Sequence, residues 1–319
     1  MPDPMPDPMS VTPATTATAA TAINGTSAPS LGPSTDSRDD GPPVVLLDLD
    51  GVVWLAHHAI PGSVEAIAAL RAAGRRVLFV TNNSASTVEE QEAALAAIGI
   101  PATGDVLTSA MAGALLVEPG EHVLVCGGAG VMQAVQRRGA VPVRISELDD
   151  DTADGTDATD AAAANGAGGA TFDAVMVGLH RDFDYHGLRR ASRVVRDGAR
   201  LIGTNDDATY PTPDGPIPGG GAILAAYIVA SGATPVIAGK PYEPMARLVR
   251  EVVGVRRATD AVMVGDRPET DGLFAQTLGC RFALVWSGVT APHTTVQPVP
   301  DLALPDLGAV VAALLAAGS

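Results

Sequence analysis

The sequence predicts an α/β fold built on a doubly wound, Rossmann-like parallel sheet. Short apolar runs alternate with Ala-rich amphipathic segments from residue 43 to the end of the chain, a pattern typical of parallel strands covered by helices. There are ten such runs, more than one compact unit usually needs, and a hydrophobic share of 46% is large enough to fill two cores. We therefore expect two α/β domains.

The first apolar run, residues 44–50, is unbroken, which indicates a strand buried on both faces. Further strands are expected at 76–81, 105–108, 122–126, 141–145, 174–179, 200–204, 236–238, 261–264 and 282–286. The amphipathic segments predict helices at 62–73, 86–98, 110–117, 129–138, 184–197, 221–231, 243–253, 269–278 and 306–316.

Two segments lie outside this pattern. Residues 1–42 open with MPDPMPDP and continue through Thr, Ala, Ser and Pro, so we expect a disordered, low-complexity tail. Residues 147–173 carry eight acidic residues and no basic one, and lack the Gly and distal Glu of a calcium loop, so we expect a solvated acidic insertion. Most of the formal net charge of -16 lies in these two segments. The mildly acidic remainder gives no support to a nucleic-acid or membrane partner, and we expect neither.

The two cysteines, Cys126 and Cys280, lie inside apolar runs, which favours reduced thiols over a disulfide framework. No stretch of about 18 uninterrupted apolar residues occurs, and the N-terminus has neither a basic n-region nor an apolar h-region. We therefore expect a cytoplasmic protein without a membrane span or secretion signal.

Polar residues stand at the ends of several expected strands, where open parallel sheets bind ligands. These residues, with one lysine in a turn between the expected strands, are Asp48, Asp50, Thr81, Asn82, Asn83, Lys240, Asp266 and Asp271. Together they offer carboxylates for a hard cation, a hydroxyl and backbone N–H groups for phosphoryl oxygens, and a lysine as a point charge. Taken singly, TNN is an ordinary helix N-cap signal and GKP an ordinary turn. The combination indicates a phosphoryl-transfer site.

Other phosphate and metal motifs do not fit the sequence. A P-loop needs a glycine where Thr234 stands and Ser or Thr where Pro241 stands. A dinucleotide fingerprint over Gly128, Gly130 and Gln133 lacks its third glycine or alanine. Because neither HExxH nor CxxC occurs, structural zinc is not expected.

The motifs DLDGVVW, TNN, GKP and VGDRPETD, in this order, resemble the four motifs of the haloacid dehalogenase (HAD) superfamily, specifically the NagD-like and p-nitrophenyl phosphatases of subfamily IIA. The resemblance covers nearly everything from residue 43 to the C-terminus. In that branch a large α/β cap of the C2 type is inserted into the core between the second and third motifs, and the gap from Asn83 to Lys240 is long enough to hold one. The resemblance thus implies a core at 43–115 and 233–319 with a smaller, inserted α/β cap at 116–232. GLHRDFDYHGL and TNDDATYPTPDGPIPGGGAI resemble its cap segments. The tail and the acidic insertion are not part of the family pattern.

The resemblance implies a role for each motif residue. Asp48 would be the nucleophile that forms an aspartyl-phosphate, and Asp50 the general acid and base. Mg²⁺ would be held by the carboxylates of Asp48 and Asp266 and by the backbone carbonyl of Asp50, with Asp271 supporting the metal loop. The residues implied in phosphate binding are Thr81, Asn82, Asn83 and Lys240.

The inserted cap would close over the site, exclude water and select the leaving group. Tyr210 and His180 are the candidates for substrate specificity, and Arg181 and Asp182 are further candidates beside His180. For His180 a surface histidine is an equally good interpretation. Relatives commonly form homodimers through the cap, so we also expect that assembly.

The resulting prediction is a Mg²⁺-dependent phosphatase that hydrolyses small phosphomonoesters, with glycerol phosphate, phosphoglycolate or a sugar phosphate as the expected substrate. A phosphomutase is one alternative, although such enzymes usually carry a small helical cap at another insertion point. A non-catalytic ligand-binding regulator is another, although it would be expected to have lost a motif residue. A dehalogenase has little use for Asp50 or Asp266.

Overall fold

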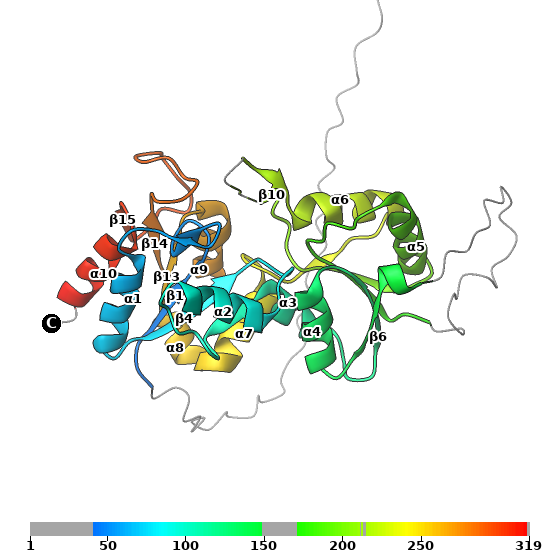
Figure 1. Ribbon diagram of the computed structural model, residues 1–319, viewed down its shortest axis with the longest axis horizontal. Helices are drawn as coiled ribbons and strands as arrows, with labels where there is room; N and C mark the ends of the chain where they lie inside the picture. The colour runs from blue at the N-terminus through cyan, green and yellow to red at the C-terminus, as the bar shows by residue number, and fades with distance from the viewer. Residues whose placement is uncertain (1–40, 149–170, 211, 213–214, 318–319) are drawn as a thin grey trace, which may run out of the picture. The chain divides into compact units, whose positions relative to one another are not determined.

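Two parallel sheets organise the part of the chain that this computed structural model describes, residues 41–148, 171–210, 212 and 215–317 (Figure 1). The described residues from Gly41 onward belong to one compact unit. The prediction of an α/β fold with two parallel sheets is confirmed. The expected tail, up to residue 40, and residues 149–170 of the expected acidic insertion lie outside the described residues.

The first sheet, which we call the core sheet, has the strand order β15-β14-β13-β1-β4-β5, and all neighbouring strands are parallel. Its strands are β1 (Val44–Leu47), β4 (Arg76–Thr81), β5 (Val106–Thr108), β13 (Val262–Gly265), β14 (Arg281–Val285) and β15 (Leu302–Leu304). β1 lies between β13 and β4, with Leu46 opposite Met263 on one side and Leu78 on the other. The carboxyl ends of these three strands are therefore adjacent.

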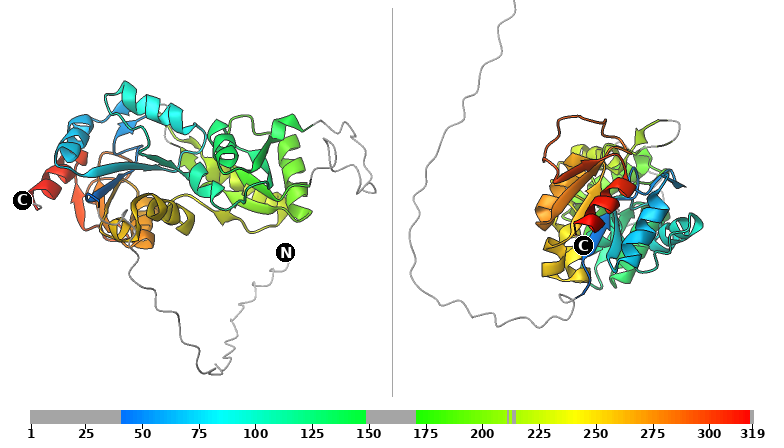
Figure 2. Two further views of the ribbon diagram at one scale, coloured as in Figure 1. Left: turned by 90° about the horizontal axis from the view of Figure 1, so that it is seen from below. Right: turned by 90° about the vertical axis from the view of Figure 1, so that its left-hand side faces the viewer.

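β1 is buried on both faces, as its unbroken apolar run predicts. Val45 and Leu47 pack into one hydrophobic core, and Val44 and Leu46 into another. The helices of the first core are α1 (Ser63–Ala72), α2 (Val88–Ala97) and α10 (Leu307–Ala316); those of the second are α3 (Ser109–Ala114), α7 (Glu243–Val253), α8 (Val255–Thr259) and α9 (Leu273–Leu278). Figure 2 shows α1 and α2, in blue and cyan, and α7, in yellow, on opposite sides of the core sheet.

The second sheet, which we call the cap sheet, has the order β12-β9-β8-β6-β7 and is also parallel throughout. Its strands are β6 (His122–Cys126), β7 (Val141–Arg144), β8 (Ala174–Val177), β9 (Arg200–Gly203) and β12 (Val236–Ile237). Helix α4 (Ala129–Arg137) covers one face, and α5 (Tyr185–Arg196) with α6 (Gly220–Ser231) covers the other. β12 lies beyond residue 232, where the sequence places the return to the main domain, so the cap sheet includes a strand from the far side of that boundary.

The ten strands and nine helices expected from the sequence all have counterparts, with shorter ends in many cases. Two small antiparallel hairpins were not expected: β2 (Trp54–Leu55) with β3 (His58–Ala59), and β10 (Thr209–Tyr210) with β11 (Ile217–Pro218). The expected helix at 269–278 instead begins as a π-helical turn, Pro268–Gly272, before α9. Further unexpected elements are α8, β15 and a 3₁₀ turn, Ile145–Glu147.

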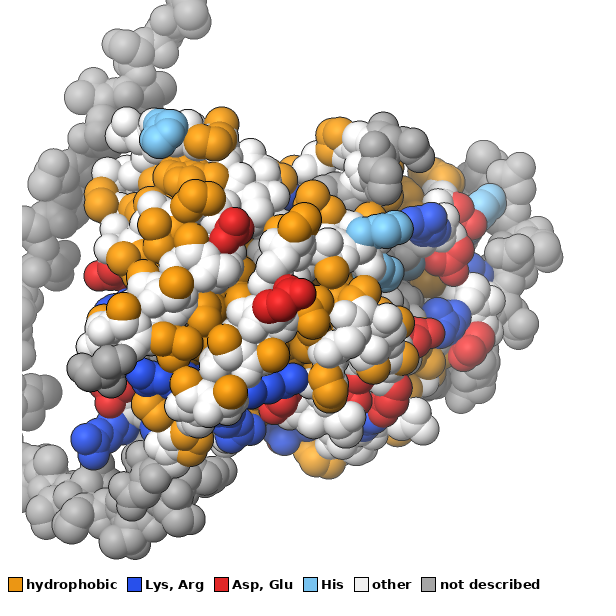
Figure 3. All heavy atoms as spheres, turned by 60° about the vertical axis from the view of Figure 1, so that its left-hand side comes forward, with side chains coloured by type: hydrophobic (Ala, Val, Ile, Leu, Met, Phe, Trp, Pro, Cys, Tyr) orange, Lys and Arg blue, Asp and Glu red, His pale blue; other side chains and the backbone are white. Residues whose placement is uncertain are grey.

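Both cysteines are free, with Cys126 buried and Cys280 half-buried, as the sequence predicts. Among the described residues, none of the helices combines the length and apolar character needed to cross a bilayer. On the face drawn in Figure 3, acidic and basic side chains are interspersed among apolar ones.

Candidate active site

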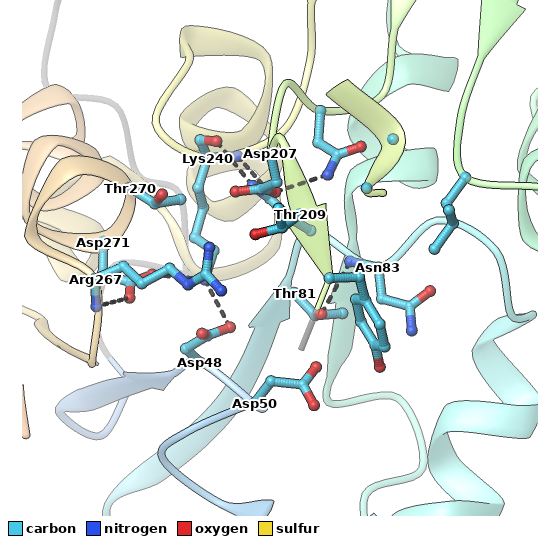
Figure 4. Close-up of a pocket in the computed structure, with 16 residues that line it drawn as sticks. Asp48, Asp50, Thr81, Asn83, Asp207, Thr209, Lys240, Arg267, Thr270 and Asp271 are labelled. Atoms are coloured by element: carbon cyan, nitrogen blue, oxygen red, sulfur yellow. Dashed lines mark hydrogen bonds and ion pairs between the residues drawn. The ribbon is translucent and has the colours of Figure 1, made fainter. Parts of the chain in front are cut away.

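A pocket lies at the carboxyl ends of β1, β4 and β13, where residues from the core sheet and from the cap meet (Figure 4). It measures about 590 Å³ including its open mouth, a size suited to a small ligand. Of the predicted site residues, those that line it are Asp48, Asp50, Thr81, Asn82, Asn83, Tyr210, Lys240 and Asp271. The structure therefore brings together residues spread over more than 220 positions of the chain.

Lys240 is fully enclosed and carries the only lysine ammonium of the 319 residues. Its Nζ donates to Asp48 Oδ1 at 2.8 Å and to Asp271 Oδ1 at 2.7 Å. Burial alone would lower the pKa of Lys240, but the carboxylates of Asp271 and Asp48 overcome this effect and raise it above its usual value. The lysine is therefore a permanent cation at the end of β1.

Three carboxylates gather beside this ammonium. One oxygen from each of Asp48, Asp266 and Asp271 lies within 4.8 Å of the others. Asp266 is buried, its Oδ2 accepts from Val289 N at 2.7 Å, and its Oδ1 has no hydrogen-bond partner among the described residues. Burial, followed by the negative charge of Asp48, raises the pKa of Asp266. Such a cluster of negative charge is stable only with a compensating cation or bound protons.

Both oxygens of Asp271 are already engaged, since Oδ1 accepts from Lys240 and Oδ2 accepts from Arg267 N at 3.1 Å. The oxygens left for a cation are therefore chiefly those of Asp48 and Asp266. Close packing fixes Asp266, because a Cβ added at Gly288 would lie 1.9 Å from its Oδ2, and one added at Gly51 would lie 2.5 Å from the same atom. Gly51 also has a φ of 87°, which glycine adopts without strain.

Asp50 lies in a different environment from Asp48. Burial, followed by the negative charge of Asp48, raises its pKa to about 7. Its Oδ1 and the indole Nε1 of Trp54 are both buried, and the indole N–H offsets part of the rise in the pKa. A carboxyl group with this pKa holds a proton in a substantial fraction of molecules at neutral pH.

The residues after β4 use their polar groups in ways that the sequence did not indicate. Asn83 N donates to Thr81 Oγ1 at 3.1 Å, and the Asn83 side chain accepts from Ala85 N at 3.0 Å. The carboxamide of Asn82 bonds to the backbone of Lys240, with Lys240 N donating to Oδ1 at 2.8 Å and Nδ2 donating to Lys240 O at 3.0 Å. The TNN and GKP motifs are thus bonded to each other, although 158 positions separate Asn82 from Lys240.

The two predicted specificity candidates differ in position. Tyr210, in β10, lines the pocket, and burial, followed by the charge of Asp50, raises its pKa to about 12. His180 does not line the pocket. It is buried, its Nδ1 is 2.9 Å from Gly178 O, and its ring meets Phe183 edge-on at 6.0 Å between centroids.

Several residues that line the pocket were not chosen from the sequence as site residues: Leu179, Asn205, Asp207, Thr209, Gly219, Gly220, Arg267 and Thr270. Asn205 and Asp207 follow β9 of the cap sheet, so the strand-exit argument used for the core sheet would have found them. Figure 4 shows Arg267 extended from the loop after β13 toward Lys240 and Asp48.

Comparisons with known proteins agree with this geometry. Residues 45–141 match the family model of haloacid dehalogenase-like hydrolases, and residues 237–310 match a second, HAD-hydrolase-like model. D-glycerol 3-phosphate phosphatase of Mycobacterium tuberculosis is 33% identical over 80% of this chain and 66% of its own length. Acid sugar phosphatase of Staphylococcus saprophyticus is 33% identical over 77% of this chain and 86% of its own.

Solved structures give the same result. The p-nitrophenyl phosphatase of Archaeoglobus fulgidus has a TM-score of 0.72 and 26% identity, covering 86% of this chain and 99% of its own. A glycerol phosphate phosphatase of Mycobacterium tuberculosis in complex with magnesium has a TM-score of 0.69 and 30% identity, covering 85% of this chain and 76% of its own.

A parallel core sheet with its acidic site at the strand ends and an inserted α/β cap defines a hydrolase of the HAD class. The chain belongs to the haloacid dehalogenase-like hydrolases, in the NagD-like and p-nitrophenyl phosphatase family. It is a phosphoric monoester hydrolase that acts on small phosphomonoesters.

Proposed function

We propose that the protein is a Mg²⁺-dependent phosphatase that works through an aspartyl-phosphate on Asp48. One observation carries the proposal: the buried ammonium of Lys240 lies against the carboxylate of Asp48 in the pocket. The Asp48 side chain is 14% exposed there, so a substrate can reach it. A nucleophile must reach the substrate, while the cation that neutralises phosphoryl oxygens must be held rigidly. Both conditions are met here.

The donor set fits Mg²⁺. Asp48 and Asp266 offer hard carboxylate oxygens, Asp266 Oδ1 is buried without a partner among the described residues, and a relative has been crystallised with magnesium. We assign these two carboxylates and the backbone carbonyl of Asp50 as the protein's ligands, with Asp271 holding Lys240 and the loop. When bound, the ion would neutralise negative charge between the carboxylates and the phosphoryl group.

In the first step, an Asp48 oxygen attacks phosphorus while the bond from phosphorus to the leaving oxygen breaks. Asp50 gives its proton to that oxygen, which its raised pKa allows at neutral pH. In the second step, Asp50 takes a proton from water as the water oxygen attacks phosphorus, and the bond to Asp48 breaks. The products are the alcohol and inorganic phosphate, with both aspartates restored.

Thr81, Lys240 and the backbone N–H of Asn82 would bind the equatorial oxygens, while the Asn83 N–H, which donates to Thr81 Oγ1, would orient that hydroxyl. Loss of one such preorganised donor typically costs about 3 kcal/mol in barrier height. The Thr81 hydroxyl, which accepts from Asn83 N, is free to donate its own proton to a phosphoryl oxygen.

For the substrate we propose a small phosphorylated metabolite, with glycerol phosphate, phosphoglycolate and a sugar phosphate as the candidates. Support comes from the pocket size and from relatives described as glycerol 3-phosphate, sugar and phosphoglycolate phosphatases. Tyr210 and the neighbouring Thr209 are the proposed contacts to the leaving group. A homodimer through the cap and a cytoplasmic location stay predictions.

Release of phosphate from p-nitrophenyl phosphate, glycerol phosphate, phosphoglycolate and sugar phosphates, measured with Mg²⁺ and with EDTA, tests the proposal. We expect turnover only with the metal, and none for Asp48→Asn with an unchanged circular dichroism spectrum. Turnover that persists in EDTA or in the Asp48→Asn protein would refute it.

A further inference from the structure

A carboxylate of the cap, Asp207, is bonded to the catalytic motifs of the core. Asp207 follows β9 and lines the pocket. Its Oδ2 accepts from Asn82 Nδ2 at 2.9 Å and from Asn205 Nδ2 at 2.7 Å. Figure 4 shows Asp207 beside the backbone of Lys240 and away from Asp48 and Asp50, which carry the proposed chemistry.

Asn82 connects this carboxylate to the catalytic lysine. Its carboxamide bonds to Lys240 at both the backbone N–H and the backbone carbonyl, at 2.8 and 3.0 Å, while the same Nδ2 bonds to Asp207. A carboxamide could rotate and exchange its oxygen and nitrogen, but the acceptor at Asp207 requires the nitrogen on that side. The carboxylate therefore adds a second, charged acceptor to the Lys240 carbonyl, and both favour the orientation in which Asn82 fits the Lys240 backbone.

The backbone at two glycines packs closely against the side-chain amides of Asn82 and Asn205. A Cβ at Gly239 would lie 2.5 Å from Asn82 Oδ1, and a Cβ at Gly220 would lie 2.3 Å from Asn205 Oδ1. Glycine at both positions lets the two amides approach the chain closely. The contact is thus a packed joint between cap and core.

We propose that Asp207 is a positioning residue: through Asn82 it holds the Lys240 backbone, so that the ammonium stands against Asp48 when the cap is in place. The joint requires a hydrogen-bond acceptor at position 207 and does not require a negative charge. This role rests on the proposed function of Lys240, and it couples the position of the cap to the competence of the phosphate site.

Steady-state kinetics of two variants show whether position 207 needs a hydrogen-bond acceptor or a negative charge. Asp207→Ala removes the acceptor and lowers kcat by roughly 10- to 100-fold, as expected for loss of charged hydrogen bonds, with KM changed by less than about threefold. Asp207→Asn keeps an oxygen that can accept from both amides, so its kcat stays within about threefold of wild type. Equal losses in the two variants, or a raised KM with unchanged kcat, would overturn the proposal.

Asp206, the residue before Asp207, provides a matched control. Asp206 is exposed and accepts from the Tyr242 hydroxyl, so Asp206→Asn weakens another contact between cap and core without touching Asn82. Its kcat stays at the wild-type value.

The factor by which Asp207→Ala lowers kcat is the same for p-nitrophenyl phosphate and for the best natural substrate, since the phosphate site serves both. A loss confined to one substrate would make Asp207 a leaving-group contact instead.

A measurement without substrate separates this inference from the phosphatase proposal. Because Lys240 is the only lysine, protein grown with ¹³C-lysine gives one set of lysine side-chain signals. We expect the Cε signal to move in Asp207→Ala and in Asp207→Ser, whose side chain is too short to reach both amides, and to coincide with wild type in Asp206→Asn. Coincidence of all four spectra in folded proteins would refute the positioning role, whether or not the enzyme turns over.

Discussion

Replacing Lys240 by methionine tests how the buried charges of the site are balanced. The substitution keeps the length and apolar stem of the side chain but removes the ammonium between Asp48 and Asp271. Lys240 and Asp271 each have a side-chain exposure of 1%, so water cannot replace the lost cation. Breaking a buried pair from one side typically costs about 3–5 kcal/mol, and we expect a loss of this size in the free energy of unfolding of Lys240→Met.

The loss should depend on pH in a defined direction. Burial already raises the pKa values of Asp266 and Asp271, and loss of the ammonium raises that of Asp271 further, so the folded state binds more protons than the unfolded state above about pH 4. Stability then falls as pH rises, and the difference from wild type is larger at pH 8 than at pH 5. Adding Asp271→Asn to Lys240→Met removes one of the unpaired charges and should restore part of the loss at pH 8.

Urea unfolding in EDTA, followed by tryptophan fluorescence, measures these quantities. Trp54 and Trp286 are the only tryptophans of the sequence, and both belong to the two cores that flank the core sheet, so the signal reports on the domain that holds the site. The reasoning would be refuted if the free energy of unfolding of Lys240→Met lay within about 1 kcal/mol of wild type at pH 8 and Asp271→Asn added no stability. The ammonium would then not be compensating buried carboxylate charge.

Three further outcomes are expected. With Asp50 as the general acid, kcat falls as pH rises through about 7, because the carboxyl group loses the proton it must donate. Asp50→Asn should lower kcat by roughly 10²- to 10⁴-fold. A wild-type kcat that does not change from pH 5 to 9 would contradict this role. Because the folded-state pKa of Asp266 is raised, the metal-free protein binds extra protons when folded and should lose thermal stability from pH 5 to pH 8. A calorimetric unfolding midpoint that does not fall over this range, or that falls equally with Mg²⁺ bound, would argue against a metal site at the carboxylate cluster. Gly288→Ala places a Cβ 1.9 Å from Asp266 Oδ2 and should weaken Mg²⁺ activation. Gly62→Ala is the control for backbone strain away from the site, because Gly62 has a φ of 84° and its added Cβ meets nothing within 4 Å. Equal Mg²⁺ titrations of the two variants would argue against Asp266 as a metal ligand.

The parts of the site that follow apolar strands could be predicted from the sequence. Asp48 ends an unbroken apolar run, and Asp266 follows another, so their place at the edge of a parallel sheet follows from hydrophobic patterning alone. The bond between Asn82 and Lys240 could not be predicted in this way. Pairing between residues 158 positions apart depends on the three-dimensional path of the cap, which patterning does not specify.

The hairpin of β2 and β3 shows why short elements escape prediction. Its two-residue turn, Ala56 and His57, has positive φ at both positions, 47° and 65°. Such turns are usually recognised by Asn-Gly or Asp-Gly, and Ala-His carries no such signal. Burial of Trp54 within the core holds the turn in place. The interpretation of His180 as a surface histidine is wrong, because the side chain is buried with its Nδ1 2.9 Å from Gly178 O.

The order in which the chain is synthesised gives the central position of β1 a further consequence. β1 and Asp48 leave the ribosome 192 residues before Lys240, and β13, the neighbour of β1 in the sheet, follows later still. At typical translation rates this interval lasts roughly 10–40 s. Four adjacent strands of the cap sheet, β6 to β9, are complete before β13 is made. The cap can therefore fold first, while β1, whose four residues are all apolar and buried, still lacks one partner. A nascent chain that ends before residue 240 has no ammonium to set beside Asp48, so the charge pair of the proposed mechanism forms only after the cap has been made.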